Sequence, residues 1–376
     1  METNLKTYQC AIVGGGLAGL CLAIQLADKG ISVLLFEKNT YPFHKVCGEY
    51  ISMESWDFLN ELGLLLDELK LPRIIELGIS SEKGFVLNAA LPLGGFGISR
   101  YSLDAYLCEI ARKKNVQVIE NCKVFDVQST DENNFQINTS FGLYQANLVC
   151  GTYGKYTPTF VKEDNAQPNS LNYIGVKYHI KTKLKPNRIE LHNFKDGYCG
   201  VSKVDGDAYC LCYLSSSINL QQSGNDIKQM EETILYKNPF LKEYFTQSEF
   251  LFESPLVISN ITFRKKGTYK SNLFLAGDAA GTITPLCGNG MSMAMRASKL
   301  LAQLVVDFFN ASITKNQLIE TYHAAWNNAF HTRIQSGYYL QHLFGKKYTT
   351  HYTLKLLDKL PSLSKKIISL THGQPF

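Results

Sequence analysis

The sequence predicts an α/β (α+β) fold in which one lobe, divided in the sequence, brackets an antiparallel β-sheet insert and is followed by a helical C-terminal tail. Three observations predict this arrangement. An apolar strand passes through a glycine-rich turn into a helix near the N-terminus, a second apolar strand ends at Gly277-Asp278, and four β-like segments with polar turns lie between them. The first pattern is typical of a βαβ unit, and successive strands joined by polar turns are typical of an antiparallel sheet.

The βαβ unit begins with an apolar strand over residues 8–13, and its second strand ends at Glu37. Gly14 permits the tight turn, Gly16 lets the backbone approach a pyrophosphate, and Gly19 lets the helix pack closely on the strand. The helix N-terminus offers free N–H groups and a positive dipole end to phosphates. The carboxylate roughly 20 residues on accepts hydrogen bonds from a ribose diol. This spacing predicts a bound adenine dinucleotide and leaves open whether it is FAD or NAD(P).

The remainder of the first half predicts short helices and strands. Residues 53–69 are expected to form one helix, or two short helices broken at Gly63. Apolar residues at helical spacing predict a helix over residues 102–114. Alternating or β-rich runs predict strands over residues 74–79, 84–87, 116–119, 123–128, 134–139 and 146–150.

The second half predicts the insert and the tail. Four strands are expected over residues 171–181, 187–194, 198–204 and 207–214, and helices over residues 226–235, 239–244 and 290–309. A buried strand is expected over residues 273–276, and residues 315–376 are largely helical. The expected divisions are a cofactor-binding domain at residues 1–72, 96–162 and 262–320, a β-rich substrate-binding domain at 73–95 and 163–261, and a helical C-terminal region at 321–376.

Composition restricts the classes of function. A chain of 376 residues can bury a large core and is expected to hold two domains. The net charge of +5 is mild, and no basic motif interleaved with aromatics is present, so nucleic-acid binding is not expected. The 21 tyrosines and 21 phenylalanines suit either an apolar ligand cavity or an aromatic-rich core.

The cysteines and the N-terminus indicate the compartment. None of the ten cysteines forms a Cys-x-x-Cys pair, so no metal site is expected. The first nine residues are polar, which argues against a signal peptide, and no apolar run reaches about 18 residues. We therefore expect a cytoplasmic protein with mainly free cysteines.

The strand that ends at Gly277-Asp278 distinguishes between the dinucleotides, because residues 273–291 run from this strand through a glycine-bearing loop into a helix. Together with the N-terminal turn, this pair of motifs resembles the FAD-binding fold of the geranylgeranyl reductase and para-hydroxybenzoate hydroxylase superfamily of FAD-dependent oxidoreductases. The resemblance implies a Rossmann-like FAD-binding lobe in which Asp278 binds the ribityl chain and the next helix points its N-terminus at the flavin pyrimidine. A helix N-terminus there stabilises the negative charge of reduced flavin.

Further segments extend the resemblance over about residues 7–160 and 262–310. Residues 44–49 resemble the Cys-Gly loop of geranylgeranyl reductases, which runs close to the flavin, and residues 99–104 resemble the helix start whose arginine contacts the cofactor. Non-covalent FAD is implied. The motifs and the resemblance together nominate as cofactor-binding residues Gly14, Gly16, Leu17, Ala18, Gly19, Glu37, Lys45, Gly48, Arg100, Val124, Gly277, Asp278, Pro285, Gly288, Gly290 and Met291.

Three departures from the family pattern bear on the reaction. Tyr153 stands where these families carry the Asp of an Asp-Gly pair that is linked in the monooxygenases to NAD(P)H binding, so NAD(P)H or another external reductant stays open. Residues 197–202 keep the Gly-Tyr of the geranylgeranyl reductase substrate motif and lack its Trp and Pro. The Trp-x-Trp-x-Ile-Pro signature of flavin halogenases is absent, since the chain has only Trp56 and Trp326.

Three residues are candidates for catalysis: Cys47, Glu49 and Tyr198. Cys47 and Cys287 fall in loops expected near the flavin, where they could form a redox-sensitive pair or remain two small buried thiols. Glu49 could act as an acid with a raised pKa, or be a surface loop charge. Tyr198 could line the substrate cavity or donate a hydrogen bond there, or be an ordinary sheet aromatic.

Two further features have a functional and a structural interpretation. His179 and His192 lie on insert strands that could face a substrate, although a single strand histidine is more often half-buried. Residues 338–347 place aromatics beside positive charge, and residues 355–366 add lysines. These C-terminal residues could touch a membrane surface, or form a solvated basic face packed on the cofactor lobe.

Three functions fit the sequence. In the first, reduced FAD passes hydride to a double bond of a lipid or polyprenyl-like substrate, as the Cys-Gly-Glu loop favours. In the second, reduced FAD reacts with oxygen to hydroxylate or epoxidise an aromatic or polyketide-like compound. In the third, the chain is a non-catalytic flavin-binding redox sensor. All three imply a hydrophobic or aromatic small-molecule ligand, and the sequence sets no oligomeric state.

Overall fold

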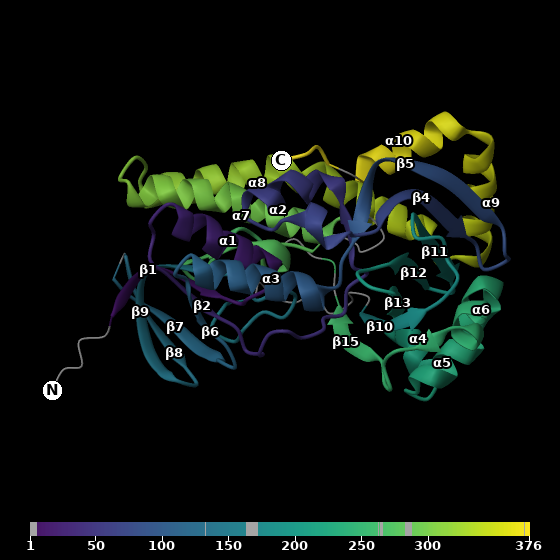
Figure 1. Ribbon diagram of the computed structural model, residues 1–376, viewed down its shortest axis with the longest axis horizontal. Helices are drawn as coiled ribbons and strands as arrows, with labels where there is room; N and C mark the ends of the chain where they lie inside the picture. Colours follow the sequence, from purple (N-terminus) through teal and green to yellow (C-terminus); the bar gives the residue numbers. More distant parts are fainter. Residues whose placement is uncertain are drawn as a thin grey trace.

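Two β-sheets lie toward opposite ends of the molecule, with helices packed against both (Figure 1). The computed structural model describes residues 6–131, 133–162, 172–261, 263, 266–282, 288–371 and 373–376. Within these residues one sheet has eight strands and the other has nine. The predicted α/β class is confirmed.

The first sheet contains the predicted βαβ unit. β1 (Thr7–Val13) pairs in parallel with β2 (Val33–Phe36) on one side and with β9 (Gly142–Gly151) on the other. Strand order is β16-β17-β9-β1-β2-β6, where β6 is Gln117–Ile119, β16 is Tyr269–Lys270 and β17 is Leu273–Leu275. β17 joins the sheet from far along the sequence and places Phe274 opposite Cys150. The central strands are apolar along their length because both faces of the sheet are covered.

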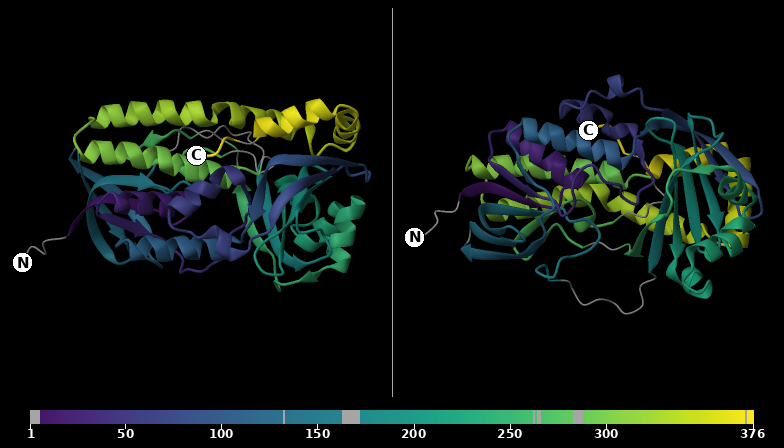
Figure 2. Two further views of the ribbon diagram at one scale, coloured as in Figure 1. Left: turned by 45° about the horizontal axis from the view of Figure 1, so that its top comes forward. Right: turned by 60° about the horizontal axis from the view of Figure 1, so that its bottom comes forward.

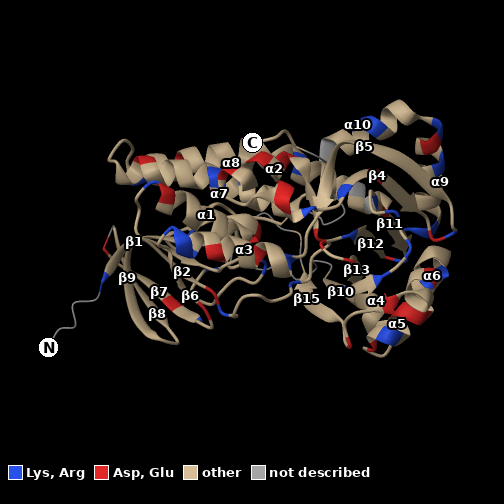
Figure 3. Cartoon of the chain, in the orientation of Figure 1, with Lys and Arg blue, Asp and Glu red and all other residues tan. Residues whose placement is uncertain are grey.

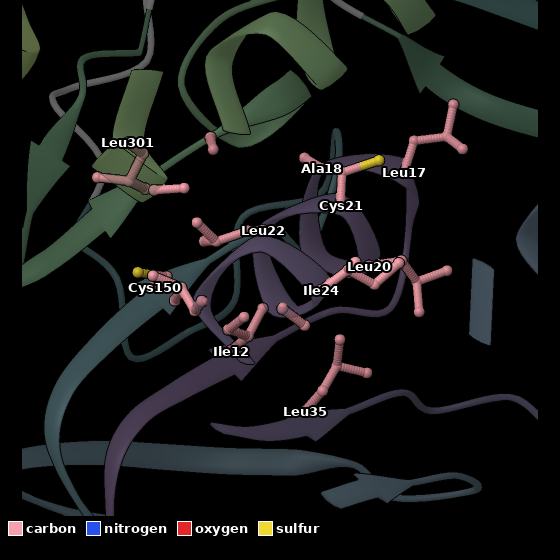
Figure 4. Packing of buried hydrophobic residues seen from close by; sticks show 14 of the residues in the cluster. Ile12, Leu17, Ala18, Leu20, Cys21, Leu22, Ile24, Leu35, Cys150 and Leu301 are labelled. Carbon is pink, nitrogen blue, oxygen red and sulfur yellow. The ribbon is translucent and has the colours of Figure 1, made fainter. Parts of the chain in front are cut away.

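Three helices pack on this sheet or on one another. α1 (Leu17–Asp28) packs against both α3 (Arg100–Lys113) and α7 (Gly290–Phe309). Figure 4 shows Leu20 and Leu22 of α1 above the sheet residues Ile12 and Leu35. All four side chains are fully buried, and burying one such side chain contributes about 1.5–3 kcal/mol. This packing fixes the glycine turn that joins β1 to α1.

A short meander extends the first sheet. β7 (Val124–Asp131) pairs antiparallel with β8 (Asn134–Thr139), and β8 pairs antiparallel with β9. The strands predicted over residues 123–128, 134–139 and 146–150 are confirmed.

The second sheet is built largely from the predicted insert. Its four antiparallel strands are β10 (Tyr173–Lys181), β13 (Tyr209–Ser216), β12 (Gly197–Lys203) and β11 (Arg188–Phe194), in that spatial order. β11 then pairs in parallel with β4, so an early segment of the chain completes the sheet. The remaining strands are β3 (Tyr50–Ser52), β4 (Arg73–Ser80), β5 (Val86–Gly97), β14 (Glu249–Phe250) and β15 (Leu256–Ile261).

β5 is longer than the sequence predicts. The strand expected over residues 84–87 instead runs from Val86 to Gly97 and continues past Pro92 and Gly94, which resemble strand breakers. Gly94 has φ +71°, and the register of β4 against β5 shifts between Ile74 and Glu76. This irregularity accommodates the glycine without ending the pairing.

The segment before β4 forms short helical pieces. η1 (Met53–Ser55) and α2 (Trp56–Glu61) precede Gly63, which has φ +102°, and η2 (Leu66–Leu69) follows it. A left-handed backbone at a glycine ends a helix readily. Of the two predicted interpretations of residues 53–69, the one broken at Gly63 is confirmed.

Helices cover one face of the second sheet, and three more form the tail. α4 (Ser217–Gln222), α5 (Ile227–Thr233), η3 (Leu235–Lys237) and α6 (Pro239–Gln247) enclose an apolar cluster with β10 and β13. In the predicted helical tail, α8 (Lys315–Leu343) packs on α7, and α9 (Lys347–Lys359) and α10 (Pro361–Thr371) pack on β5 (Figure 2). None of the helices in the described ranges combines the length and apolar character needed to cross a bilayer.

Candidate functional site

The glycine turn between β1 and α1 is as tight as the sequence predicts. Gly14 has φ +110°, and a Cβ added there would lie 2.6 Å from the carbonyl oxygen of Thr152. A Cβ on Gly19 would lie 2.1 Å from the carbonyl oxygen of Gly14, so only glycine permits this approach. The Thr152 hydroxyl also donates to the Gly14 carbonyl oxygen at 2.6 Å. α1 starts after Gly16 without a side-chain cap, which leaves its N-terminal N–H groups available to an anion.

Two cations lie beside Gly16, the third glycine of this turn. A Cβ on Gly16 would be 3.8 Å from Nζ of Lys45 and 3.9 Å from Nη2 of Arg100. Both cations contact Asp104: Arg100 donates from Nε and Nη2 at 2.7 Å each, and Lys45 lies at 3.0 Å. Burial would raise the pKa of Asp104, but Arg100 and then Lys45 hold it below its ordinary value. The ammonium of Lys45 and the guanidinium of Arg100 beside Gly16 suit a pyrophosphate.

Glu37 is held at the same turn from the other side. Its Oε2 accepts the N–H of Gly15 at 3.0 Å, and its Oε1 accepts the N–H and Nδ2 of Asn39 at 3.0 and 2.9 Å. The Tyr41 hydroxyl donates to the Gly15 carbonyl oxygen. These bonds fix the carboxylate at the end of β2, where the sequence expects a ribose. The sequence interpretation did not single out Asn39 or Tyr41.

The second predicted motif lies against the start of α1. β17 ends at η4 (Gly277–Ala279), which carries Asp278. Gly277 has φ +65°, and a Cβ there would lie 3.1 Å from Cβ of Ala18 and 3.6 Å from Cβ of Ala294. η4 therefore packs between the N-terminal turns of α1 and α7. A small cavity beside Asp278 and Gly290 is also lined by Trp326 and Phe330 of α8.

The Cys-Gly loop meets the start of α7. Sγ of Cys47 lies 3.5 Å from Sδ of Met291, and α7 begins at Gly290 without a side-chain cap. Gly288 has φ +65°, and a Cβ there would lie 3.2 Å from the ring of Tyr50. The structure therefore brings a predicted catalytic thiol to a predicted cofactor-binding helix start. Pro285 and Cys287 lie outside the described residues, and with them the predicted pairing of Cys287 with Cys47.

Glu49 does not have the raised pKa that was expected of an acid. The residue is fully buried at φ +56°, where its Oε1 accepts from Nζ of Lys177 at 2.5 Å and from the N–H of Arg100 at 2.7 Å. Its Oε2 lies 2.6 Å from Nε2 of His179. Burial alone would raise the pKa of Glu49, but the hydrogen bond from His179 and the charge of Lys177 lower it below the ordinary value. Glu49 is therefore an ionised anchor and not a proton donor at neutral pH.

The second sheet holds the backbone of the same loop. Nζ of Lys177 donates to the carbonyl oxygen of Lys45, and Sγ of Cys210 donates to that of Cys47, each at 3.2 Å. Lys177 is fully buried, and although burial lowers its pKa, the neighbouring Glu49 carboxylate raises it above the ordinary value. The loop that carries Lys45 and Cys47 is thus fixed by side chains of β10 and β13. The sequence interpretation did not include Lys177, although a lysine inside the apolar run of residues 174–180 was a signal.

The register of the second sheet separates the two candidate histidines. Lys177 pairs with Cys212 and His179 with Cys210, so these side chains share the face that holds the loop. His192 pairs with Cys199, which pairs with Tyr213, on the opposite face. There its ring stacks on Phe240 of α6 at 5.5 Å, and its Nδ1 lies 2.8 Å from Oγ of Ser80. The hypothesis that His192 faces a substrate is therefore wrong.

Tyr198 lies on the loop-bearing face. It pairs with Leu214 of β13. Leu214 follows Cys212 by two residues and Cys210 by four, so the side chains of Tyr198 and of these three residues lie on one face of the sheet. Its ring packs in a small cluster with Leu214 and Ile261. Its role in lining a cavity stays a prediction, as does the cofactor contact expected of Val124, the first residue of β7.

This chain resembles a family model and several curated proteins. A family model described as an NAD(P)-binding Rossmann-like domain matches residues 12–46. Digeranylgeranylglycerophospholipid reductase 1 of Methanococcoides burtonii is 24% identical over 90% of this chain and 84% of its own. Conditioned medium factor receptor 1 of Dictyostelium discoideum is 24% identical over 86% of this chain and 68% of its own. Kynurenine 3-monooxygenase of the same organism is 26% identical over 75% and 66%.

Solved structures share the fold across almost the whole chain. A flavin-dependent brominase superposes with a TM-score of 0.80 at 17% identity over 97% of this chain and 93% of its own. A geranylgeranyl bacteriochlorophyll reductase-like protein of Thermoplasma acidophilum gives a TM-score of 0.77 at 17% identity over 99% and 97%. The resemblance predicted from the two glycine motifs is confirmed, and these solved structures share the fold.

Proposed function

We propose that this chain is a FAD-dependent oxidoreductase that holds FAD without a covalent bond and acts on a hydrophobic small molecule. The observation that carries the proposal is the meeting of two half-sites. Lys45 and Arg100 lie at the glycine turn of α1, and Cys47, two residues after Lys45, lies against Met291 at the uncapped start of α7. FAD is long enough to need both half-sites, one for its pyrophosphate and one for its flavin ring.

The residues present fit FAD chemically. The open position at Gly16, with Lys45 and Arg100 beside it, matches the charge and the close approach of a pyrophosphate. Glu37 would accept hydrogen bonds from the adenosine ribose, and Asp278 from the ribityl chain. The N–H groups at the start of α7 would lie at the pyrimidine edge of the flavin, where reduction adds negative charge.

The reaction that we favour is geranylgeranyl reductase-like reduction of a carbon–carbon double bond. Bound FAD, when reduced, would supply the hydride to one carbon of the bond, and the other carbon would take a proton, for which the Cys47 thiol is our candidate donor. The Cys-Gly-Glu loop supports this reaction, and so does the likeness to a digeranylgeranylglycerophospholipid reductase. Because Glu49 is ionised and engaged by Lys177 and His179, it positions the loop, and Cys47 is the residue we propose beside the reacting atoms. Tyr198 would line the substrate side.

The predicted lobes become part of this proposal. The FAD-binding domain would comprise residues 1–72, 96–162 and 262–320, and the substrate-binding domain residues 73–95 and 163–261. The sheets support this division, since β1, β9 and β17 share the first sheet and β10 to β13 share the second. The contacts from Lys177 and Cys210 to the loop would then couple the substrate lobe to the flavin.

A second candidate is oxygen insertion into an aromatic or polyketide-like compound. The likeness to kynurenine 3-monooxygenase favours it. The segment that ends β9 argues against direct docking of NAD(P)H, because Tyr153 replaces the family aspartate beside the glycine turn, its Cα 2.8 Å from a Cβ added to Gly14. The electron donor therefore stays open between NAD(P)H and another external reductant.

One experiment separates the candidates. The FAD-loaded protein is reduced by light without oxygen, with EDTA as the electron donor, and mixed with a geranylgeranyl lipid or with an aromatic substrate, and the product is examined by mass spectrometry. A product that gains two hydrogens supports the reductase. If an aromatic substrate gains one oxygen atom after air is admitted, the monooxygenase is supported. Bound FAD with neither product leaves the redox sensor. Cys47→Ala should keep FAD and lose turnover at least tenfold, whereas Cys122→Ala removes a buried thiol elsewhere and should keep both.

A further inference from the structure

Helix α9 exposes an apolar stripe on the side away from its own core contacts. Leu354 and Leu357 are buried against β5. Tyr348, Tyr352 and Leu356, spaced four residues apart, are 61%, 62% and 56% exposed. Residues at this spacing share one helix face. The fold therefore uses one side of α9 and leaves an aromatic and aliphatic row on the other.

Lysines are interleaved with that row. Lys355 and Lys359 are exposed and flank Tyr348 on the same face of the helix. α10 continues the pattern with exposed Leu363, Lys365 and Lys366. We call the exposed residues of α9 and α10 the C-terminal face: Tyr348, Tyr352, Lys355, Leu356, Lys359, Leu360, Leu363, Lys365 and Lys366.

Charge is concentrated in the same segment. Residues 346–371 hold six lysines and one aspartate, a net charge equal to the +5 of the whole chain, so the rest of the sequence is balanced. Figure 3 shows lysines on α9 and α10 at one end of the molecule. Lys83, in the turn between β4 and β5, adds a further ammonium 4.3 Å from the ring centre of Tyr348.

We propose that the C-terminal face docks on the surface of an anionic lipid bilayer. An interfacial helix places aromatic and leucine side chains at the headgroup boundary and basic side chains toward anionic lipids, without spanning the membrane. The stems of Lys355 and Lys359 can lie along the apolar row while their ammonium groups reach phosphates. The centres of protein–protein interfaces are depleted in lysine, so the interleaving favours lipid over a protein partner. The proposal does not depend on the reaction catalysed.

Flotation of the full-length protein with vesicles tests the proposal. Wild type should float with phosphatidylcholine vesicles that contain one third phosphatidylglycerol, and bind at least tenfold more weakly to phosphatidylcholine alone. Lys355→Glu/Lys359→Glu should lower binding to the anionic vesicles at least tenfold. Tyr348→Ser/Tyr352→Ser should do the same even at low salt, because insertion of the rings is lost. Lys29→Glu/Lys113→Glu makes the same charge change on exposed residues of the first lobe and should bind as wild type.

Unchanged thermal unfolding of each variant shows that the fold is kept. Three results would overturn the proposal. These are no binding of wild type to anionic vesicles, an equal loss in Lys29→Glu/Lys113→Glu, or a wild-type dimer in light scattering that Tyr348→Ser/Tyr352→Ser dissociates.

Discussion

Replacing Lys177 by methionine should be among the most destabilising single changes in the protein. Lys177 and Glu49 are both fully buried, and the ammonium lies 2.5 Å from the carboxylate. At an effective dielectric constant of about 20, two unit charges at that distance attract by roughly 7 kcal/mol before desolvation is subtracted. Removing one partner of a buried pair costs about 3–5 kcal/mol, because the other charge is left uncompensated. We expect Lys177→Met to lower the free energy of unfolding by that amount.

A double-mutant cycle isolates the pair. Glu49→Gln/Lys177→Met removes both charges, so it should be more stable than the sum of the two single losses implies, with a coupling of about 1–3 kcal/mol. Urea unfolding of the FAD-loaded proteins, followed by circular dichroism and flavin fluorescence, provides the free energies. The loss in Lys177→Met should also release the loop and speed FAD dissociation.

The pH dependence of Lys177→Met gives the same test with a definite sign. In wild type the lowered pKa of Glu49 contributes stability above its unfolded value, and that stability is lost as pH falls through the folded pKa. In Lys177→Met the buried carboxyl can take up a proton, so the deficit should shrink from pH 7.5 toward pH 5. A deficit below about 0.5 kcal/mol, or strictly additive losses in the cycle, would refute the ion-pair anchor.

The remaining predictions concern three separate regions. Gly16→Ala places a methyl group where a pyrophosphate must approach, so FAD affinity should fall at least tenfold in a fluorescence titration. Unchanged FAD affinity in Gly16→Ala would contradict a pyrophosphate site at the glycine turn. Burial raises the pKa of Glu231 to about 7 even though the Tyr178 and Tyr213 hydroxyls donate to it. The neutral acid is thus favoured in the fold, and about 3 kcal/mol of stability should be lost as pH rises from 4.5 through 7. Glu231→Gln should abolish that slope in urea unfolding, and a slope that persists would assign it to another group. His192→Phe should lower the melting temperature and leave kcat within about twofold, since the ring packs on the helix-covered face, and a large loss of kcat with unchanged stability would return His192 to the site.

Local sequence patterns were sufficient for most of the elements and for the glycine turn. Gly14 and Gly19 each meet a steric limit set by adjacent backbone, and such limits leave a signature in the sequence. The strands over residues 171–214 alternate or run apolar, and they form in the predicted places. β5 was predicted too short because a proline and a glycine pair inside a strand are compatible with pairing only where the partner strand shifts its register.

The electrostatic contacts of the site could not be predicted from spacing. Lys177 meets Glu49 across 128 residues, and that contact depends on how the second sheet packs on the loop. The same packing reverses the expected pKa shift of Glu49, since a buried carboxyl rises or falls according to its partners. His179 and His192 resemble one another in sequence, but strand register places them on opposite faces. Such differences follow from pairing, which no local pattern encodes.

Binding of FAD itself tests the central claim most directly. The purified protein is incubated with FAD, passed through gel filtration, and denatured to release any flavin that is not covalently bound. We predict one FAD per chain after filtration, complete release on denaturation, and weaker retention in Lys45→Met, which removes one of the two cations beside Gly16. A folded protein that retains no flavin after this treatment, or that binds NAD⁺ in its place, would contradict the account.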